Sequence, residues 1–276
     1  MKRVHAAKHS RVHLGGILVG SVAAVLIVTL SACGGQPAEQ ISDTKIVGGD
    51  RVASSDAVVK STVALLSPQG SEFCTGSLIS NMHVMTASHC LDGLPWSRIY
   101  VYFGTTARAG SLQSSRLRYA VRARMNENFN RAAMDQDEAT SPPNDIAILT
   151  LNSAAPAGYA PAAMLSASDP LTVGEPLILA GFGLTRYDGQ TTGTLYKVTT
   201  KLAAISTVAK ELHFGSRPGH SACMGDSGGP AFVMRNNQLA LVGVTSRGSS
   251  VCAGDGIYTD ARQFRGWLST QQAQVP

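Results

Sequence analysis

An all-β fold that ends in a single helix is the class that this sequence predicts, for two reasons. From Ile46 onward, short apolar runs are separated by Gly, Ser, Asn and Pro about every 8–15 residues, which is typical of sandwiches and barrels. Helical periodicity is convincing only near the end, in residues 261–272, where Phe264, Trp267 and Leu268 fall at i, i+3 and i+4. No alternation of strands with helices indicates a parallel sheet.

The apolar runs predict the strands in chain order. Each run is short and is bounded by turn-forming residues. The runs are residues 61–66, 76–79, 83–86, 99–103, 146–151, 176–180, 196–200 and 239–245.

A further predicted strand carries arginines at alternate positions. In an extended chain, residues two apart share a face, so we expect one basic face and one largely apolar face. The strand is either a solvated outer strand of a barrel or a basic exosite for an acidic substrate or for anionic lipid headgroups. The basic face would comprise Arg116, Arg118, Arg122 and Arg124, and the other face Leu117, Tyr119, Val121 and Ala123.

Composition and charge exclude several classes of protein. The chain has 276 residues, of which 44% are apolar and 15% are charged, and this balance excludes a disordered or fibrous chain. The net charge is +5, but residues 1–45 hold five Lys or Arg and only two acids, which leaves 18 basic and 16 acidic residues elsewhere. A nucleic-acid partner is therefore not expected.

The N-terminus has the parts of an export signal. Four basic residues, Lys2, Arg3, Lys8 and Arg11, precede an uncharged stretch of 17 residues from Leu14 to Leu30. A membrane-spanning anchor is the alternative, but this stretch includes four glycines and serines and is marginal for crossing about 30 Å of hydrocarbon. We expect residues 1–32 to be a signal peptide.

The segment Leu-Ser-Ala-Cys that ends at Cys33 resembles a bacterial lipobox, in which the cysteine becomes the lipid-modified first residue. Residues 34–40 are polar and flexible, as a tether would be. Lipidation of Cys33 would also explain an odd count of five cysteines, because the other four could then form two disulfides outside the cytoplasm. The alternative is cleavage nearby and free secretion.

Three separated segments offer a histidine, an aspartate and a serine in that chain order. A serine hydroxyl is a poor nucleophile until an imidazole takes its proton, and the imidazole needs a carboxylate to fix its tautomer. Gly-Asp-Ser-Gly-Gly is the rarest of the segments, because turn-forming residues surround one hydroxyl. The three residues are His89 in Thr-Ala-Ser-His-Cys, Asp145 in Asn-Asp-Ile-Ala-Ile-Leu, and Ser227 in Gly-Asp-Ser-Gly-Gly-Pro.

These segments resemble the His, Asp and Ser blocks of trypsin/chymotrypsin-like serine peptidases. Further matches occur in the family's order, so the resemblance covers about residues 46–270. They are Ile-Val-Gly-Gly from Ile46, Phe-Cys-Thr-Gly-Ser-Leu-Ile from Phe73, Gly-Phe-Gly from Gly181, Ser-Arg-Gly from Ser246, Gly-Ile-Tyr-Thr from Gly256, and the closing helix. The resemblance implies two six-stranded antiparallel barrels with a C-terminal helix. Residues 46–276 would form the peptidase domain, divided at about Ser153 into half-barrels 46–153 and 154–276.

The resemblance also implies roles for residues of this chain. Ser227 would be the nucleophile that forms an acyl-enzyme, His89 the general base and then acid, and Asp145 the carboxylate that orients His89. Backbone N–H groups of Gly225 and Ser227 would form the oxyanion hole. Ser246 would support Asp145 and line the substrate channel.

Two disulfides follow from the same resemblance, Cys74 with Cys90 and Cys223 with Cys252, although the sequence alone allows three pairings. No metal and no cofactor are expected, because no Cys or His cluster has metal spacing. Asp135, Asp137 and Glu138 also lack the spacing of a calcium loop.

Activation is expected to follow the family's pattern. Cleavage between Lys45 and Ile46 would free an amine that pairs with Asp226, and residues 33–45 would be the tether and activation segment. The activating protease would cut after a basic residue. The alternative is that Ile46 merely starts a strand.

The pocket is expected to be uncharged, because Ser221 stands where members with a basic preference have an acid. With Gly248 and Gly256 leaving the pocket open, we expect a preference for large apolar or aromatic residues before the cleaved bond, and no self-activation at Lys45. Asp255 could instead restore a basic preference, and Arg247, in place of the usual Trp, could favour acidic substrate residues.

Two alternatives remain for the function and for one loop. The chain is expected to be an exported endopeptidase for polypeptides, tethered through Cys33 or secreted. The competing hypothesis is a catalytically silent or narrowly gated binding or adhesion module. The loop of residues 131–143 before Asp145 could either restrict substrates or be a solvated surface loop.

Overall fold

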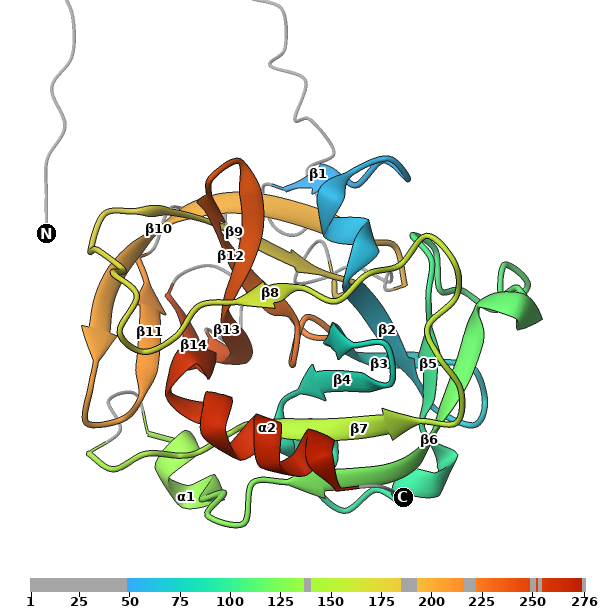
Figure 1. The fold of residues 1–276 in the computed structure, drawn as a ribbon, viewed down its shortest axis with the longest axis horizontal. Helices are drawn as coiled ribbons and strands as arrows, with labels where there is room; N and C mark the ends of the chain where they lie inside the picture. Colours follow the sequence, from blue (N-terminus) through green and yellow to red (C-terminus); the bar gives the residue numbers. More distant parts are fainter. Residues whose placement is uncertain are drawn as a thin grey trace, which may run out of the picture. The chain divides into compact units, whose positions relative to one another are not determined.

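The computed structural model describes residues 49–136, 140–184, 193–215, 222–248, 252 and 255–274. They form two rings of six antiparallel strands and end in a short helix, which confirms the predicted fold class (Figure 1). Lys45, Ile46, Cys33 and the predicted signal lie outside the described residues. None of the helices in the described ranges is long and apolar enough to cross a bilayer.

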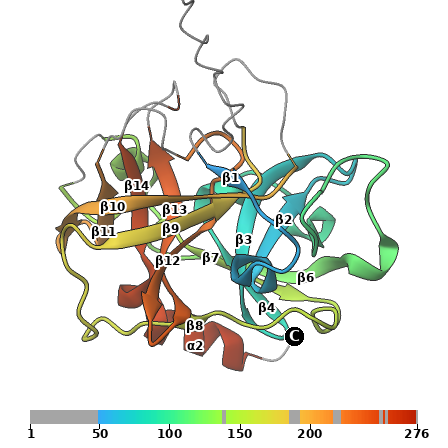
Figure 2. The same cartoon turned by 90° about the horizontal axis from the view of Figure 1, so that it is seen from above.

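The first barrel closes in the order β2-β3-β4-β7-β6-β5. Its strands β2, β3, β4 and β6 lie to the right of the strands labelled β9 to β14 in Figure 2. All of β2 is buried, because β9 and the 3₁₀ helix η1 (Ala57–Lys60) also pack against it. Its strands are β2 (Thr62–Leu66), β3 (Glu72–Ser80), β4 (His83–Thr86), β5 (Tyr100–Tyr102), β6 (Leu117–Met125) and β7 (Ala147–Leu151).

The second barrel closes in the order β9-β10-β11-β14-β13-β12 and back to β9. Asn236 and Asn237, both at positive φ, make the tight turn between β12 and β13, a conformation that asparagine tolerates. Its strands are β9 (Pro176–Gly181), β10 (Tyr196–Ser206), β11 (Glu211–Phe214), β12 (Pro230–Arg235), β13 (Gln238–Gly248) and β14 (Gly256–Asp260). Two short strands extend the ring, β1 (Asp50–Arg51) on β10 and β8 (Ala163–Met164) on β13.

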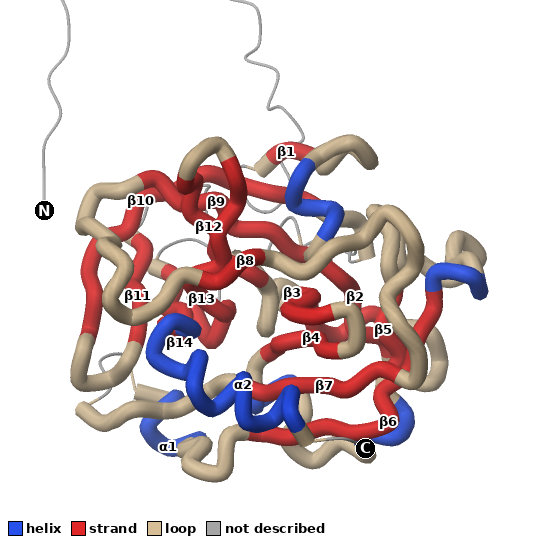
Figure 3. The backbone as a smooth tube through the Cα atoms, in the orientation of Figure 1, coloured by secondary structure: helices blue, strands red, loops and turns tan. Residues whose placement is uncertain are grey.

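The closing helical segment begins at Ala261, as the sequence predicts, and ends one residue beyond the predicted Gln272. Its first turn is the 3₁₀ helix η5 (Ala261–Phe264), and α2 (Arg265–Ala273) follows (Figure 3). The buried side chains Phe264 and Leu268 join the larger core cluster, and η5 contacts β13 while α2 contacts β7, so the end of the chain packs against both barrels. Four short helices lie in loops, η2 (Ser88–Cys90), η3 (Trp96–Arg98), η4 (Ser114–Arg116) and α1 (Arg131–Met134).

The predicted division of the arginine strand into two faces is wrong. Tyr119 is 46% exposed and Ala123 only 8%, although alternation assigns them to one face. The register shifts between Ala120 and Arg122, which indicates a β-bulge. Beyond the bulge, side chains at odd-numbered positions face the opposite side of the sheet from those before it. Arg116 lies in η4 rather than in β6.

The bulge leaves the arginines with separate partners. Arg118 donates from Nε to the Ala154 carbonyl at 2.7 Å. Arg122 donates to the carbonyl of Gln274, at the end of α2, at 3.1 Å. The arginines therefore do not form the single continuous face required of a basic exosite.

Candidate active site

His89 and Asp145 meet at one end of the first barrel. His89 lies in η2, just after β4, and Asp145 lies two residues before β7. His89 Nδ1 is 2.8 Å from Asp145 Oδ2, and the backbone N–H of His89 donates to Asp145 Oδ1 at 2.9 Å. Because the carboxylate is an acceptor, it favours the tautomer with the proton on Nδ1 and leaves Nε2 as a base. The His89 side chain is 15% exposed, whereas Asp145 is fully buried.

The second barrel completes the environment of Asp145. Ser246 Oγ, on β13, donates to Asp145 Oδ2 at 2.7 Å. Thr259 Oγ1, on β14, donates to the backbone carbonyl of Asp145 at 2.9 Å. The buried carboxylate thus receives hydrogen bonds from both barrels, which satisfies it and fixes the plane of the imidazole.

Ser227 lies on a glycine-containing turn that packs between the two barrels. Gly228 has a φ of 79°, and a Cβ there would lie 2.0 Å from Thr86 Oγ1, so only glycine fits. The Ser227 carbonyl accepts from the Thr75 N–H at 2.8 Å, and Gly228 N–H donates to the Thr245 carbonyl at 2.8 Å. These contacts hold Ser227 near the strand end that leads to His89.

The described residues contain no hydrogen bond between Ser227 Oγ and the His89 imidazole. Their connection runs instead through Ser246, which bonds Asp145 and lines the same pocket as Ser227. In free enzymes the bond between nucleophile and base is often long and tightens only when substrate is bound.

Two backbone N–H groups beside the serine are free of partners among the described residues. Neither Gly225 nor Ser227 donates to another described residue, whereas the intervening Asp226 N–H bonds the Cys223 carbonyl at 3.0 Å. Thr75 Oγ1 donates to the Gly225 carbonyl at 2.9 Å, which fixes the orientation of the turn. Gly225 has a φ of 95°, and a Cβ there would lie 2.8 Å from Gly183 Cα. Two such donors can receive an oxyanion.

Asp226 is buried behind this turn in a cradle of glycines. Its two oxygens accept the backbone N–H groups of Gly183, at 2.9 Å, and Cys223, at 2.8 Å. A Cβ on Gly181 would lie 2.2 Å from Asp226 Oδ1, so the Gly-Phe-Gly segment must be open here. Burial raises the pKa of Asp226 from 3.8 to about 7, against the opposing effect of the two hydrogen bonds.

Both disulfides pair as the resemblance implies. Cys74 bonds Cys90, which ties β3 to the histidine segment, and Cys223 bonds Cys252, which braces the serine turn. Cys74, His89 and Cys90 offer donor atoms within 4.8 Å of one another. Since the two sulfurs are joined, neither is a thiolate, and the group is not a plausible donor set for a metal.

The comparisons with known proteins agree with this geometry. A family model described as Trypsin matches residues 46–268. The chain belongs to the trypsin family. It is therefore a serine-type endopeptidase. The chain is similar to trypsin theta of Drosophila melanogaster, with 29% identity over 257 residues that cover 87% of this chain and 90% of that protein. Disulfide-bonded domains of the trypsin family are typical of exported proteins.

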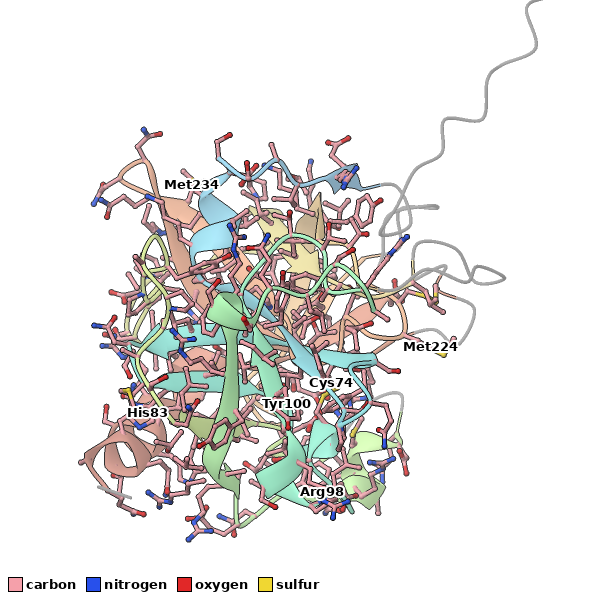
Figure 4. The ribbon with its side chains drawn as sticks, turned by 90° about the vertical axis from the view of Figure 1, so that its right-hand side faces the viewer. Cys74, His83, Arg98, Tyr100, Met224 and Met234 are labelled. Carbon is pink, nitrogen blue, oxygen red and sulfur yellow. A yellow bond between two sulfur atoms is a disulfide. The ribbon has the colours of Figure 1, made fainter. Side chains whose placement is uncertain are left out.

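A pocket of about 210 Å³ lies beside Ser227 in this trypsin-family domain. Met224 is one of its lining residues and is 58% exposed, and Figure 4 shows it at the edge of the molecule. The described lining contains no acid, and Asp255 is exposed and does not line it. Gly248 lines the pocket, Gly256 does not, and Ser221 lies outside the described residues.

A larger hollow of about 480 Å³ lies beside η1 and the turn between β12 and β13. It is lined by none of His89, Asp145 and Ser227, so its size does not make it the active site of this trypsin-family chain.

The expectation that Arg247 favours acidic substrate residues does not fit the structure. Its guanidinium bonds both oxygens of the buried Glu211, with Nη1–Oε1 at 2.6 Å and Nη2–Oε2 at 3.3 Å. The charge of Arg247 is therefore already balanced within the protein. Sequence reasoning missed Glu211, and it also missed Thr75 and Thr259, because nothing local to these residues indicates where they lie.

Proposed function

We propose that the chain is an exported endopeptidase in which Ser227, His89 and Asp145 hydrolyse peptide bonds through an acyl-enzyme. The observation that carries the proposal is the buried, triply hydrogen-bonded Asp145 against His89 Nδ1. The geometry supports one chemistry above others, the transfer of an acyl group to a serine activated by an imidazole.

In the first step, His89 Nε2 takes the proton of Ser227 as Oγ attacks the carbonyl carbon of the substrate. The carbonyl π electrons move to oxygen, which is stabilised by the N–H groups of Gly225 and Ser227. His89 then gives the proton to the leaving amine as the C–N bond breaks. Water, deprotonated by His89, attacks the ester, and the proton returns to Ser227 as the acid product leaves. Each oxyanion donor lowers the barrier by about 3 kcal/mol.

The proposed substrate preference is a large apolar or aromatic residue before the cleaved bond, with Ser221 at the base of the pocket. The absence of an acid from the described lining supports it. The full chain would be cut after Lys45 with a lysine-specific endopeptidase and tested on fluorogenic peptides that differ only in this residue. Preference for Phe, Tyr or Leu over Arg and Lys is expected, and faster cleavage after Arg or Lys would overturn it. Cleavage of no peptide would favour the gated binding module.

Activation by cleavage between Lys45 and Ile46 is proposed, with the new amine of Ile46 paired to Asp226. The burial of Asp226 supports this, because a buried carboxylate gains most from a nearby cation. Since the preferred residue before the cut is not basic, another protease would be required to cut after Lys45.

The pH dependence of stability should differ before and after this cleavage. In the uncut chain the folded pKa of Asp226, about 7, exceeds its ordinary value of 3.8. The folded state then binds more protons, so stability should fall by up to about 4 kcal/mol as pH rises from about 4 to 7. After cleavage the Ile46 amine favours the charged carboxylate, and this loss should disappear. Denaturant unfolding of cut and uncut Ser227→Ala protein at several pH values measures, for each form, the slope of the unfolding free energy against pH.

Asp226→Asn is the control for that measurement, because an amide does not titrate. The cut and the uncut Asp226→Asn chains should both lack the contribution of Asp226 to the slope of unfolding free energy against pH. Equal slopes for the cut and uncut chains with Asp226 intact would contradict the proposed activation.

Attachment to a membrane through lipidated Cys33 is proposed on the lipobox and on the pairing of the other four cysteines. Protein extracted from the membranes of its native host should carry a diacylglycerol on Cys33 when its intact mass is measured. An unmodified N-terminus downstream of Cys33 would instead indicate free secretion.

A further inference from the structure

A buried ion pair joins β11 to β13 at the edge of the substrate pocket. Glu211 is only 2% exposed, and Arg247 side-chain exposure is 13%. Removing one partner of such a pair leaves a buried charge without compensation. His213 Nε2 lies 3.7 Å from Glu211 Oε2, so Glu211 has a second basic neighbour.

Arg247 also reaches the loop before Asp145. Its Nε donates to the backbone carbonyl of Gln136 at 3.2 Å, across 111 residues of sequence. One guanidinium thus links the wall of the second barrel to a loop of the first. Because Arg247 lines the pocket together with Ser227, this link begins at the wall of the pocket.

The loop itself is ordered by its own contacts. Asn130 Oδ1 accepts from the Ala133 N–H at 3.1 Å, which caps the single turn of α1. Ala133 and Met134 are buried, with 3% and 8% exposure, so this part of the loop is more than a solvated surface segment. Arg131, at the start of α1, lies 3.5 Å from Asp92, in the segment that follows His89.

We propose that Glu211 and Arg247 form a clamp that determines substrate specificity. Arg247 holds the loop at Gln136 beside the pocket, and Glu211 both orients the guanidinium and cancels its charge. The substrate channel is therefore electrically neutral where the segment preceding the cleaved bond enters. Glu211 and Arg247 act as positioning residues, and the proposal rests on the proposed function of the same site.

Glu211→Gln tests the electrostatic part of the clamp. The amide keeps the size of the side chain and one acceptor but leaves the charge of Arg247 uncompensated. In the cut enzyme, kcat/KM for peptides with Glu rather than Gln at the second and third residues before the cut should rise roughly tenfold relative to the parent, mostly through KM. The double variant Glu211→Gln/Arg247→Gln should lose this gain.

Glu175→Gln is the matched control, because Glu175 pairs with Arg235 in a half-buried ion pair that lines no part of the substrate pocket. The ratio of kcat/KM for the Glu peptides to kcat/KM for the Gln peptides should be the same in Glu175→Gln as in the parent. An unchanged ratio in Glu211→Gln, or an equal change in Glu175→Gln, would overturn the proposed role of Glu211.

Hydrogen exchange tests the loop without any turnover. In Ser227→Ala protein, Arg247→Gln should speed amide exchange at Met134, Asp135 and Gln136 by about tenfold or more, whereas Arg235→Gln should not. Unchanged exchange with Arg247→Gln would overturn the clamp. If the parent cleaves no peptide, the proposed function fails while this measurement still decides the clamp. If Glu211→Gln does not fold, hydrogen exchange in Arg247→Gln alone decides whether the clamp exists. In that variant Glu211 still has His213 as a basic neighbour.

Discussion

Replacement of Ser227 by alanine should lower kcat by at least about 10,000-fold, with both disulfides and the fold unchanged. The hydroxyl is the only group proposed to bond covalently to the substrate, so no neighbour can replace it. The substitution removes one oxygen atom from a turn whose contacts are made by backbone, namely Ser227 O with Thr75 N and Gly228 N with Thr245 O. Stability should therefore remain close to that of the parent.

The loss of kcat is measured directly by comparing peptide hydrolysis by the activated parent protein and by activated Ser227→Ala at equal concentration. Substrate binding, followed by competition with a labelled peptide, should change by less than about threefold, because the pocket is intact. Activity within a factor of ten of the parent would contradict Ser227 as the nucleophile. Ser206→Ala is a suitable control, since Ser206 is the last residue of β10, does not line the described pocket beside Ser227, and its Oγ accepts from the Ala209 N–H at 3.1 Å.

Asp145→Asn should lower kcat by about 10,000-fold at neutral pH, with KM little changed. The carboxylate accepts from His89 Nδ1, from the His89 N–H and from Ser246 Oγ. An amide offers one oxygen and one NH₂ group to the same donors. Its NH₂ would face His89 Nδ1 or another donor, which favours the tautomer that carries its proton on Nε2 and has no base to offer Ser227.

Asp260→Asn is a useful comparison for that variant. Asp260 is also buried, and it pairs with Arg262 at 2.8 Å, but it bonds none of the residues proposed to act in catalysis. We expect Asp260→Asn to cost stability, measured by denaturant unfolding, without a loss of kcat in the folded protein. A similar loss of kcat in both variants would mean that Asp145 is required only for the fold.

The local chemistry of the active site could be predicted from the sequence. Glycines at positions 225, 228 and 229 around Ser227 indicate a tight turn around one hydroxyl, and the structure has positive φ at Gly225 and Gly228. Four cysteines outside the N-terminal segment predict two disulfides, and the pairing implied by the family resemblance is the one that formed. The bond between His89 and Asp145 is present, whereas the bond between Ser227 and His89 is not formed in the described residues.

Contacts between distant segments were decided only by the tertiary structure. The sequence determined which residue types could act and where strands and turns begin, because those properties depend on neighbours along the chain. It could not indicate that Thr259 bonds the Asp145 carbonyl across 114 residues, or that Glu211 balances Arg247 across 36. It also could not reveal the bulge that divides the arginines of β6, since a bulge depends on the register with the partner strand. Charge compensation and register belong to the folded pair of barrels, because they depend on distances that only closure of the strands establishes.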